Sequence, residues 1–91
     1  MEIVRTISLG NRYGLHARAS TRLAQTAQQF KASIRVGRAG TAEEVDAKSI
    51  IAMLTLGAPK GVELSVKASG EDAEKAMAAV IRLIEENFGE D

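Results

Sequence analysis

His16 is the one histidine of the chain, and it lies in the segment Gly14-Leu15-His16-Ala17-Arg18. The pattern that follows predicts a helix from about Ala17, so His16 stands where a loop becomes the first helical turn. A helix N-terminus offers unpaired backbone N–H groups and a partial positive charge, and both favour an anion. Arg18 adds a planar guanidinium that suits phosphate oxygens. Because a neutral imidazole is a nucleophile near neutral pH, these residues predict a site where His16 accepts a phosphoryl group.

A purely structural role for the same residues remains open. His16 could cap the helix while Arg18 lies on its solvated face. Metal binding is not expected, because a single histidine without a nearby cluster of carboxylates cannot complete a coordination shell. The chain has no cysteine, which excludes a thiolate nucleophile and a cysteine-ligated metal. It also lacks the G-x-S-x-G sequence that indicates a serine nucleophile.

The charge of the 91-residue chain is zero overall but unevenly distributed. Residues 1–45 carry seven basic and three acidic side chains, a net charge of +4, so residues 46–91 have a net charge of −4. A basic half in a neutral protein favours an acidic protein partner or a small anion. The three aromatic residues are few for stacking on bases, so we expect no nucleic acid among the partners.

Length and hydropathy set further limits on the class of protein. Ninety-one residues predict a single domain over 1–91, with one hydrophobic core and a functional site at the surface. The longest apolar run, residues 76–81, is too short to span a bilayer. The first residues lack the basic segment and apolar core of a signal peptide. We therefore expect a cytoplasmic protein without membrane insertion.

Glycines and one proline divide the chain into short elements. Alternating or β-branched patterns predict strands at residues 2–9, 32–36, 43–47 and 62–68, of which the third has the weakest pattern. Helical spacing predicts helices at residues 17–30, 48–56 and 73–88; the middle one could also be a strand, although that leaves no sensible turn before residue 62. Residues 69–72 are expected to cap the last helix and Gly89 to end it. The order βαββαβα implies an antiparallel or mixed sheet with helices on one face.

Two motifs connect these elements to a known family. The segment 14–18 is followed about thirty residues later by Lys48-Ser49-Ile50, and then by Leu56-Gly57 and Lys60-Gly61. In order and spacing the chain resembles HPr, the histidine-containing phosphocarrier of the bacterial phosphoenolpyruvate-dependent sugar phosphotransferase system, over nearly its whole length. The resemblance implies an α+β open-faced β-sandwich, with a four-stranded antiparallel sheet and three helices on one face.

The resemblance also implies roles for individual residues. His16 would be phosphorylated on Nδ1, Arg18 would balance the charge, and the backbone N–H groups of Ala17 and Arg18 would cradle the phosphate. The donor would be enzyme I, charged from phosphoenolpyruvate, and the acceptor an enzyme II A domain. Such a protein is a stoichiometric carrier and not an enzyme. We expect it to act as a monomer without a cofactor or a metal.

In this family the short second helix adds apolar contacts beside the histidine. These map onto Ile50, Ile51 and Leu54, with Ala17 and Thr21 on the first helix. Apolar residues at helical spacing more often belong to a core, so only some of them are expected to face outward.

Ser49 has two compatible interpretations. Since it precedes an apolar run, it is predicted to cap the second helix. By resemblance it is the regulatory serine that HPr kinase/phosphorylase modifies in organisms with that enzyme. A phosphate there would be stabilised by the helix N-terminus, and its charge near the phosphoryl and partner-binding site would oppose an acidic partner.

Two features depart from the family pattern. Ala19 stands where the family usually has proline after the arginine, which loses preset backbone geometry but restores an N–H donor near the phosphate. We expect the site to work with an altered phosphohistidine stability or transfer rate. The turn over residues 37–44 is slightly longer than usual, and no function is assigned to it.

Two alternative functions stay open. The chain could belong to the nitrogen-related phosphotransferase branch, or act mainly in regulation through Ser49. From a different class, it could be a small α+β module that binds RNA or a protein, with His16 as an incidental cap. Salt-dependent RNA binding without phosphoryl acceptance would distinguish that module from a carrier.

Overall fold

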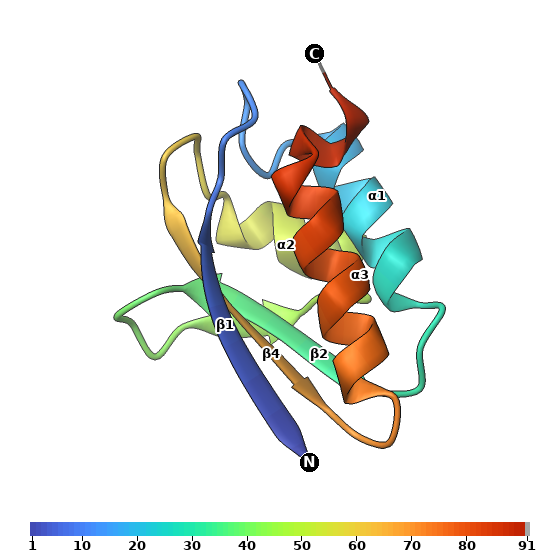
Figure 1. The fold of residues 1–91 in the computed structure, drawn as a ribbon. Helices are drawn as coiled ribbons and strands as arrows, with labels where there is room; N and C mark the ends of the chain where they lie inside the picture. Colours follow the sequence, from blue (N-terminus) through green and yellow to red (C-terminus); the bar gives the residue numbers. More distant parts are fainter. Residues whose placement is uncertain (91) are drawn as a thin grey trace.

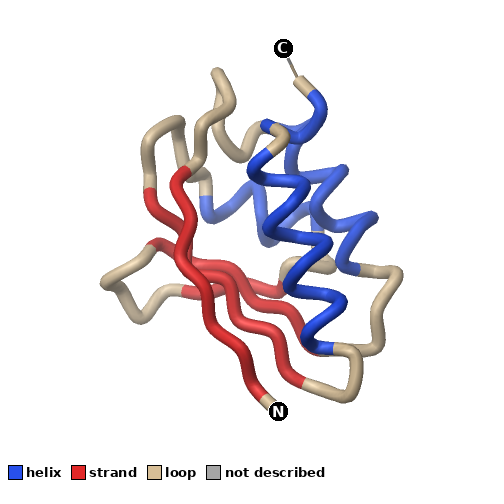
Figure 2. The backbone as a smooth tube through the Cα atoms, viewed as in Figure 1, coloured by secondary structure: helices blue, strands red, loops and turns tan. Residues whose placement is uncertain are grey.

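A computed structural model describes residues 1–90, which form two layers (Figure 1). A four-stranded sheet is one layer, and three α-helices cover one of its faces and leave the other open (Figure 2). The elements in chain order are β1 (Glu2–Ser8), α1 (Ala17–Ala27), β2 (Ser33–Arg38), β3 (Glu44–Asp46), α2 (Ile50–Leu56), β4 (Glu63–Ser69), α3 (Ala73–Glu85) and a 3₁₀ helix (Asn87–Gly89). The predicted open-faced α+β architecture is confirmed.

The strands pair antiparallel in the order β1-β4-β2-β3. β4 is central because it pairs with both β1 and β2. Its Leu64, Val66 and Ala68 are buried, as the alternation of its sequence predicted, because successive side chains of a strand point to opposite faces. The weakly predicted third strand is the three-residue β3 at the edge of the sheet.

The middle apolar segment forms a helix, α2, and not a strand. At its start the Ala52 N–H donates to the Ser49 hydroxyl oxygen at 3.1 Å, which confirms the predicted cap. At its end Gly57 has a left-handed backbone (φ 59°), and its N–H donates to the Met53 carbonyl. Met53 and Leu56 face the core, which leaves the other side of this helix free.

The first helix is shorter than predicted, since α1 ends at Ala27 and not at Phe30. The Phe30 N–H donates to the carbonyl of Ala27, three residues back, so the chain tightens into a turn. The next two N–H groups, of Lys31 and Ala32, donate to the Asp72 carboxylate at 2.9 and 2.8 Å. Helical spacing continues past Ala27, but these distant hydrogen bonds end the helix there.

Asp72 therefore has a different role from the one that the sequence indicated. It was predicted in the capping segment of α3, but its side chain makes no capping hydrogen bond in that helix. The backbone N–H groups of Lys31 and Ala32 lower the pKa of Asp72 against the opposing effect of burial. The carboxylate ties the start of α3 to the turn after α1.

The last helix also ends early, at Glu85 and not near Phe88. Asn87 and Phe88 adopt left-handed backbone angles (φ 54° and 58°), which are uncommon for residues other than glycine. The resulting turn buries the Phe88 side chain, which is 1% exposed. It also directs the end of the chain toward the N-terminal end of α1 (Figure 1). The sequence predicted that Phe88 is buried but not the turn that buries it.

Candidate functional site

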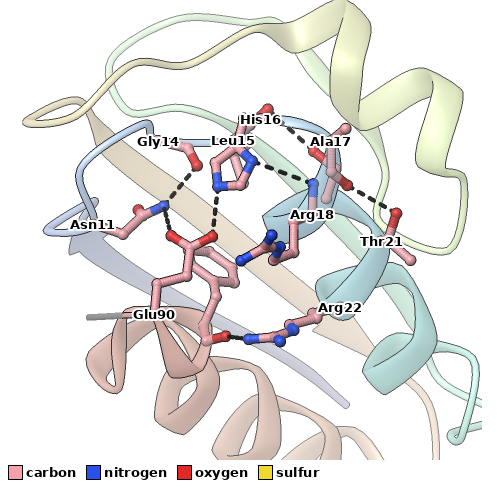
Figure 3. A network of polar contacts seen from close by, with 11 residues as sticks. Asn11, Gly14, Leu15, His16, Ala17, Arg18, Thr21, Arg22 and Glu90 are labelled. Carbon is pink, nitrogen blue, oxygen red and sulfur yellow. Dashed lines mark hydrogen bonds and ion pairs between the residues drawn. The ribbon is translucent and has the colours of Figure 1, made fainter.

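His16 is the N-cap residue of α1, with an extended backbone (φ −76°, ψ −179°). Its carbonyl accepts the first intrahelical bond, from the Ser20 N–H at 2.9 Å, so the amides of residues 17–19 precede that bond. One of these amides, the Arg18 N–H, donates to His16 Nδ1 at 3.2 Å (Figure 3). Nδ1 therefore faces the positive end of the helix.

The loop that carries His16 is held against the chain that follows α2. The Leu15 N–H donates to the Ala58 carbonyl at 2.8 Å. Gly14 has a left-handed φ of 61°, and a Cβ atom there would lie 2.3 Å from the Ala58 oxygen, so only glycine fits. Asn11, which is 2% exposed, donates from Nδ2 to the Gly14 carbonyl at 2.7 Å. These contacts fix the backbone from which the imidazole projects.

An open pocket of about 500 Å³ lies beside the imidazole and is lined by Arg12, Tyr13, His16, Ala17, Arg18 and Glu90. The exposed Tyr13 ring meets the His16 ring edge to face, with centroids 5.7 Å apart. The Arg12 guanidinium lies 5.4 Å from the centre of the Tyr13 ring. Two arginines at one small pocket suit a multiply charged anion such as a phosphoryl group.

Glu90 is the residue of this pocket that sequence reasoning missed. Its Oε2 atom lies 2.5 Å from His16 Nε2, and its Oε1 atom accepts a hydrogen bond from Asn11 Nδ2 at 3.0 Å (Figure 3). Glu90 and His16 are 74 residues apart, so no local pattern connects them. The available signal was the apolar Phe88, whose burial anchors the end of the chain beside the site.

The electrostatic surroundings keep Glu90 ionised. Burial alone would raise the pKa of Glu90, but hydrogen bonds from Asn11 and His16 and the charges of His16 and Arg18 together lower this pKa below its usual value. A lowered pKa in the folded chain means that the carboxylate adds stability above the ordinary glutamate pKa. That stability is lost as the pH falls through the lowered pKa.

The apolar residues predicted on the second helix divide between core and surface. Ile51 is 78% and Leu54 43% exposed, while Ile50 is half-buried. On α1, Ala17 is exposed and Thr21 is half-buried. The Thr21 hydroxyl donates to the Ala17 carbonyl at 2.8 Å. α2 packs against α1 (Figure 1), so the exposed Ile51 and Leu54 belong to a helix that adjoins the one His16 caps.

Ser49 is the N-cap residue of α2, and one contact places it relative to α1. Gln28, at the C-terminal end of α1, donates from Nε2 to the Lys48 carbonyl at 2.9 Å. Ser49 therefore adjoins the end of α1 opposite to His16. An α-helix rises about 1.5 Å per residue, so the 11 residues of α1 extend over about 16 Å between its two ends.

The two departures from the family pattern have clear positions. Ala19 is fully buried, and its N–H is one of the three amides before the first intrahelical bond. The turn at residues 37–44 joins β2 to β3, and its Arg38 donates from Nη2 to the Leu56 carbonyl at the end of α2, at 3.1 Å. A Cβ atom on Gly37 would lie 1.9 Å from the Glu43 oxygen, which requires glycine there.

The fold is an open-faced sandwich whose first helix is capped by a histidine, and comparisons with known proteins identify the class to which it belongs. A family model described as the PTS HPr component phosphorylation site matches residues 3–86. Phosphocarrier protein HPr of Xylella fastidiosa (strain Temecula1) is 39% identical over 85 residues, 93% of each chain. Phosphocarrier protein NPr of Escherichia coli (strain K12) is 37% identical over 91 residues, which cover both chains fully. The crystal structure of HPr-C-His from Thermoanaerobacter tengcongensis matches with a TM-score of 0.91 and 38% identity over 98% of each chain.

The chain belongs to the HPr family of phosphocarrier proteins. The resemblance predicted from the two sequence motifs is thereby confirmed. Among residues 1–90, no helix is long and apolar enough to cross a membrane.

Proposed function

We propose that the protein carries a phosphoryl group on Nδ1 of His16, accepting it from phosphorylated enzyme I and passing it to an enzyme II A domain. The observation that carries this proposal is the position of Nδ1: it accepts the Arg18 N–H at 3.2 Å, so its lone pair is free of a proton and faces the start of α1. A phosphoryl group on Nδ1 would meet the positive end of the helix and the amides of Ala17 and Arg18.

On the carrier's side, the proposed phosphoryl transfer uses only the His16 imidazole, the backbone N–H groups at the start of α1 and the Arg18 guanidinium. The Nδ1 lone pair attacks the phosphorus of the donor, and a nitrogen–phosphorus bond forms while the bond from phosphorus to the donor atom breaks. The donor atom keeps the electron pair of the broken bond. The backbone N–H groups and the Arg18 guanidinium balance the charge of the phosphoryl oxygens. Transfer to the acceptor reverses the same step, so the carrier is regenerated and is not itself an enzyme.

The partner surface in this proposal combines the pocket with the exposed apolar residues of α2. Ile51 and Leu54 supply apolar contacts, and Arg12 and Arg18 supply positive charge for an acidic partner. The same surface serves the donor and the acceptor in turn, which favours a monomer. The proposed place of transfer is the cytoplasm.

A nitrogen-related role is the second candidate. Its support is the 37% identity to phosphocarrier protein NPr, which extends over the full length of both chains. The match to phosphocarrier protein HPr is 39% over 93% of each chain, so both branches have relatives of similar identity.

The test is to incubate the protein with phosphoenolpyruvate, magnesium and either the sugar-branch or the nitrogen-branch enzyme I from its own source. Intact mass and acid lability report the product. One acid-labile phosphate is expected, and the enzyme I that phosphorylates faster identifies the branch. A protein that stays unmodified with both enzymes, and that binds RNA in a salt-dependent manner, would overturn the carrier proposal in favour of a binding module.

Replacing Ala19 by proline is expected to speed hydrolysis of the phosphohistidine. Proline removes the Ala19 N–H, one of the three donors at the start of α1. The loss of one hydrogen bond to a charged acceptor corresponds to about a 10- to 160-fold change in rate. Hydrolysis of the purified phosphoprotein measures the effect, and thermal unfolding of Ala19→Pro controls for packing at this buried position. Equal hydrolysis and transfer rates would show that this amide does not contact the phosphate.

A negative charge at Ser49 is expected to weaken docking of enzyme I without slowing the transfer step. Asp and Asn both cap a helix, so Ser49→Asp adds a charge and Ser49→Asn is its neutral control. Because Ser49 adjoins the end of α1 opposite to His16, the charge acts on the partner and not on Nδ1. The KM for enzyme I should rise about two- to fivefold in Ser49→Asp, as for an exposed charge pair. A fall in kcat at constant KM would contradict this.

HPr kinase/phosphorylase is the proposed source of such a charge in organisms that contain it. Ser49 is half-buried, and its hydroxyl oxygen already accepts the Ala52 N–H. A phosphate in its place would keep an acceptor at the start of α2 while adding negative charge to the partner surface.

A further inference from the structure

We propose that Glu90 is a positioning residue for phosphoryl transfer, which holds the His16 imidazole with its proton on Nε2 and its lone pair on Nδ1. The inference rests on the proposed role of Nδ1 as the phosphoryl acceptor. It concerns a residue at the far end of the chain that meets His16 only through the fold.

The hydrogen bonds at Nδ1 and Nε2 of the His16 imidazole both place the ring proton on Nε2. Nδ1 lies 3.2 Å from the Arg18 N–H, which is a donor, so Nδ1 must be the acceptor. Nε2 lies 2.5 Å from Glu90 Oε2, which is an acceptor, so Nε2 must carry the proton. The opposite tautomer would set two hydrogens against each other at Nδ1 and two lone pairs at Nε2. Glu90 and the Arg18 amide therefore select one tautomer from opposite sides of the ring.

The Glu90 carboxylate is itself held in place. Asn11 donates to Oε1 of Glu90 at 3.0 Å and to the Gly14 carbonyl at 2.7 Å from the same Nδ2 atom. Turning the Asn11 amide over would set its oxygen against both acceptors, so only one orientation fits. One buried side chain thus links the loop before His16 to the carboxylate that contacts the ring.

The turn of the backbone before Glu90 directs the Glu90 side chain to His16. Asn87, Phe88 and Gly89 all have left-handed backbone angles (φ 54°, 58° and 75°), which turn the chain back after α3. Arg22 on α1 donates to the Phe88 carbonyl (Figure 3), and the Phe88 side chain is buried in the core. A strained backbone held by its surroundings is characteristic of segments that position functional groups.

The carboxylate has a defined effect on the transfer step. When the nitrogen–phosphorus bond forms at Nδ1, the ring donates its lone pair and gains positive charge, while the proton stays on Nε2. Glu90, ionised and 2.5 Å from Nε2, stabilises that charge. No proton leaves the ring in either direction of transfer. The phosphohistidine is thus formed and discharged with its Nε2 proton bound to the same carboxylate.

The experiment compares Glu90→Gln and Glu90→Ala with the wild-type chain, and Glu85→Gln is the matched control because Glu85 is exposed at the end of α3. Long-range ¹H–¹⁵N spectra of the imidazole, at a pH where the ring is neutral, give its tautomer and show the Nε2-bound proton. Single-turnover transfer from phosphorylated enzyme I gives the rate. Thermal unfolding shows that each variant is folded.

In the wild type and Glu85→Gln, we expect a pure Nε2–H tautomer and a protected Nε2 proton signal. In Glu90→Ala, which has no acceptor for the Nε2 proton, the signal should be lost to exchange and the ring nitrogens should shift toward a tautomer average, with transfer about 10-fold slower. Glu90→Gln keeps an acceptor oxygen but not the charge, so it should keep the tautomer while transfer slows. Wild-type ring spectra in folded Glu90→Ala, with an unchanged transfer rate, would overturn the inference. If the wild type accepts no phosphoryl group, the proposed function fails, whereas the ring spectra still decide whether Glu90 positions His16.

Discussion

Replacing His16 by asparagine is expected to abolish phosphoryl acceptance while leaving the fold intact. The asparagine carboxamide is a favoured helix cap, so it can accept the Arg18 N–H as His16 Nδ1 does. Its nitrogen lone pair is delocalised into the carbonyl and is not a nucleophile. After incubation with phosphoenolpyruvate, magnesium and enzyme I, intact mass should show one acid-labile phosphate on the wild type and none on His16→Asn.

His16→Ala is the matched variant, because it removes both the nucleophile and the cap. Neither variant should accept phosphate, but His16→Ala should be about 1 kcal/mol less stable than His16→Asn in urea unfolding. Acid-labile phosphate on folded His16→Asn would show that another residue is the acceptor. An acid-stable phosphate would indicate modification of a hydroxyl group, with Ser49 the first position to examine.

Replacing Phe88 by alanine is expected to lower the free energy of unfolding by about 3–5 kcal/mol, the range for deleting a large buried aromatic side chain. Phe88 is 1% exposed, and its position depends on two consecutive left-handed residues. Small domains have a total stability of about 5–15 kcal/mol, so this loss is a large part of it. Urea unfolding followed by circular dichroism measures the change.

Phe30→Ala is the control for this effect, since Phe30 is only half-buried at the turn after α1. It should cost clearly less than Phe88→Ala. Equal losses would show that Phe88 is not an anchor of the core. Because Phe88 precedes Glu90 by two residues, Phe88→Ala should also release the Glu90 carboxylate from His16 and give the ring spectra of Glu90→Ala.

Elements whose structure depends on their own sequence were predictable. In β4 the alternation of Leu64, Val66 and Ala68 with polar residues gave the strand and its buried face correctly. Ser49 and Gly57 marked the two ends of α2, because a cap hydroxyl and a left-handed glycine act on adjacent amides and carbonyls. The segment around His16 likewise predicted the start of a helix, and His16 is the N-cap residue of α1.

Features that depend on distant contacts could not be predicted in this way. The end of α1 is set by Asp72, some forty residues away, and helical spacing alone carried the predicted helix on to Phe30. Glu90 reaches His16 across 74 residues, through a turn in which Asn87 and Phe88 adopt left-handed angles before Gly89. Gly89 indicated the end of the helix but not the conformation of the two residues before it. A periodic pattern predicts on which face of a helix a residue lies. It does not predict the residue at which tertiary hydrogen bonds end the helix.

The contact of Gly14 with Ala58 has a further consequence for the proposed transfer from a donor to an acceptor protein. Since the loop before His16 is already fixed to the chain after α2, each encounter begins from one conformation of the nucleophile. Ordering a flexible loop would cost conformational entropy at every association, and that cost would differ between donor and acceptor. In this chain the loop before His16 loses its conformational entropy once, during folding. The equilibrium between the two complexes is then governed by the partners' own surfaces and not by rearrangement of the carrier.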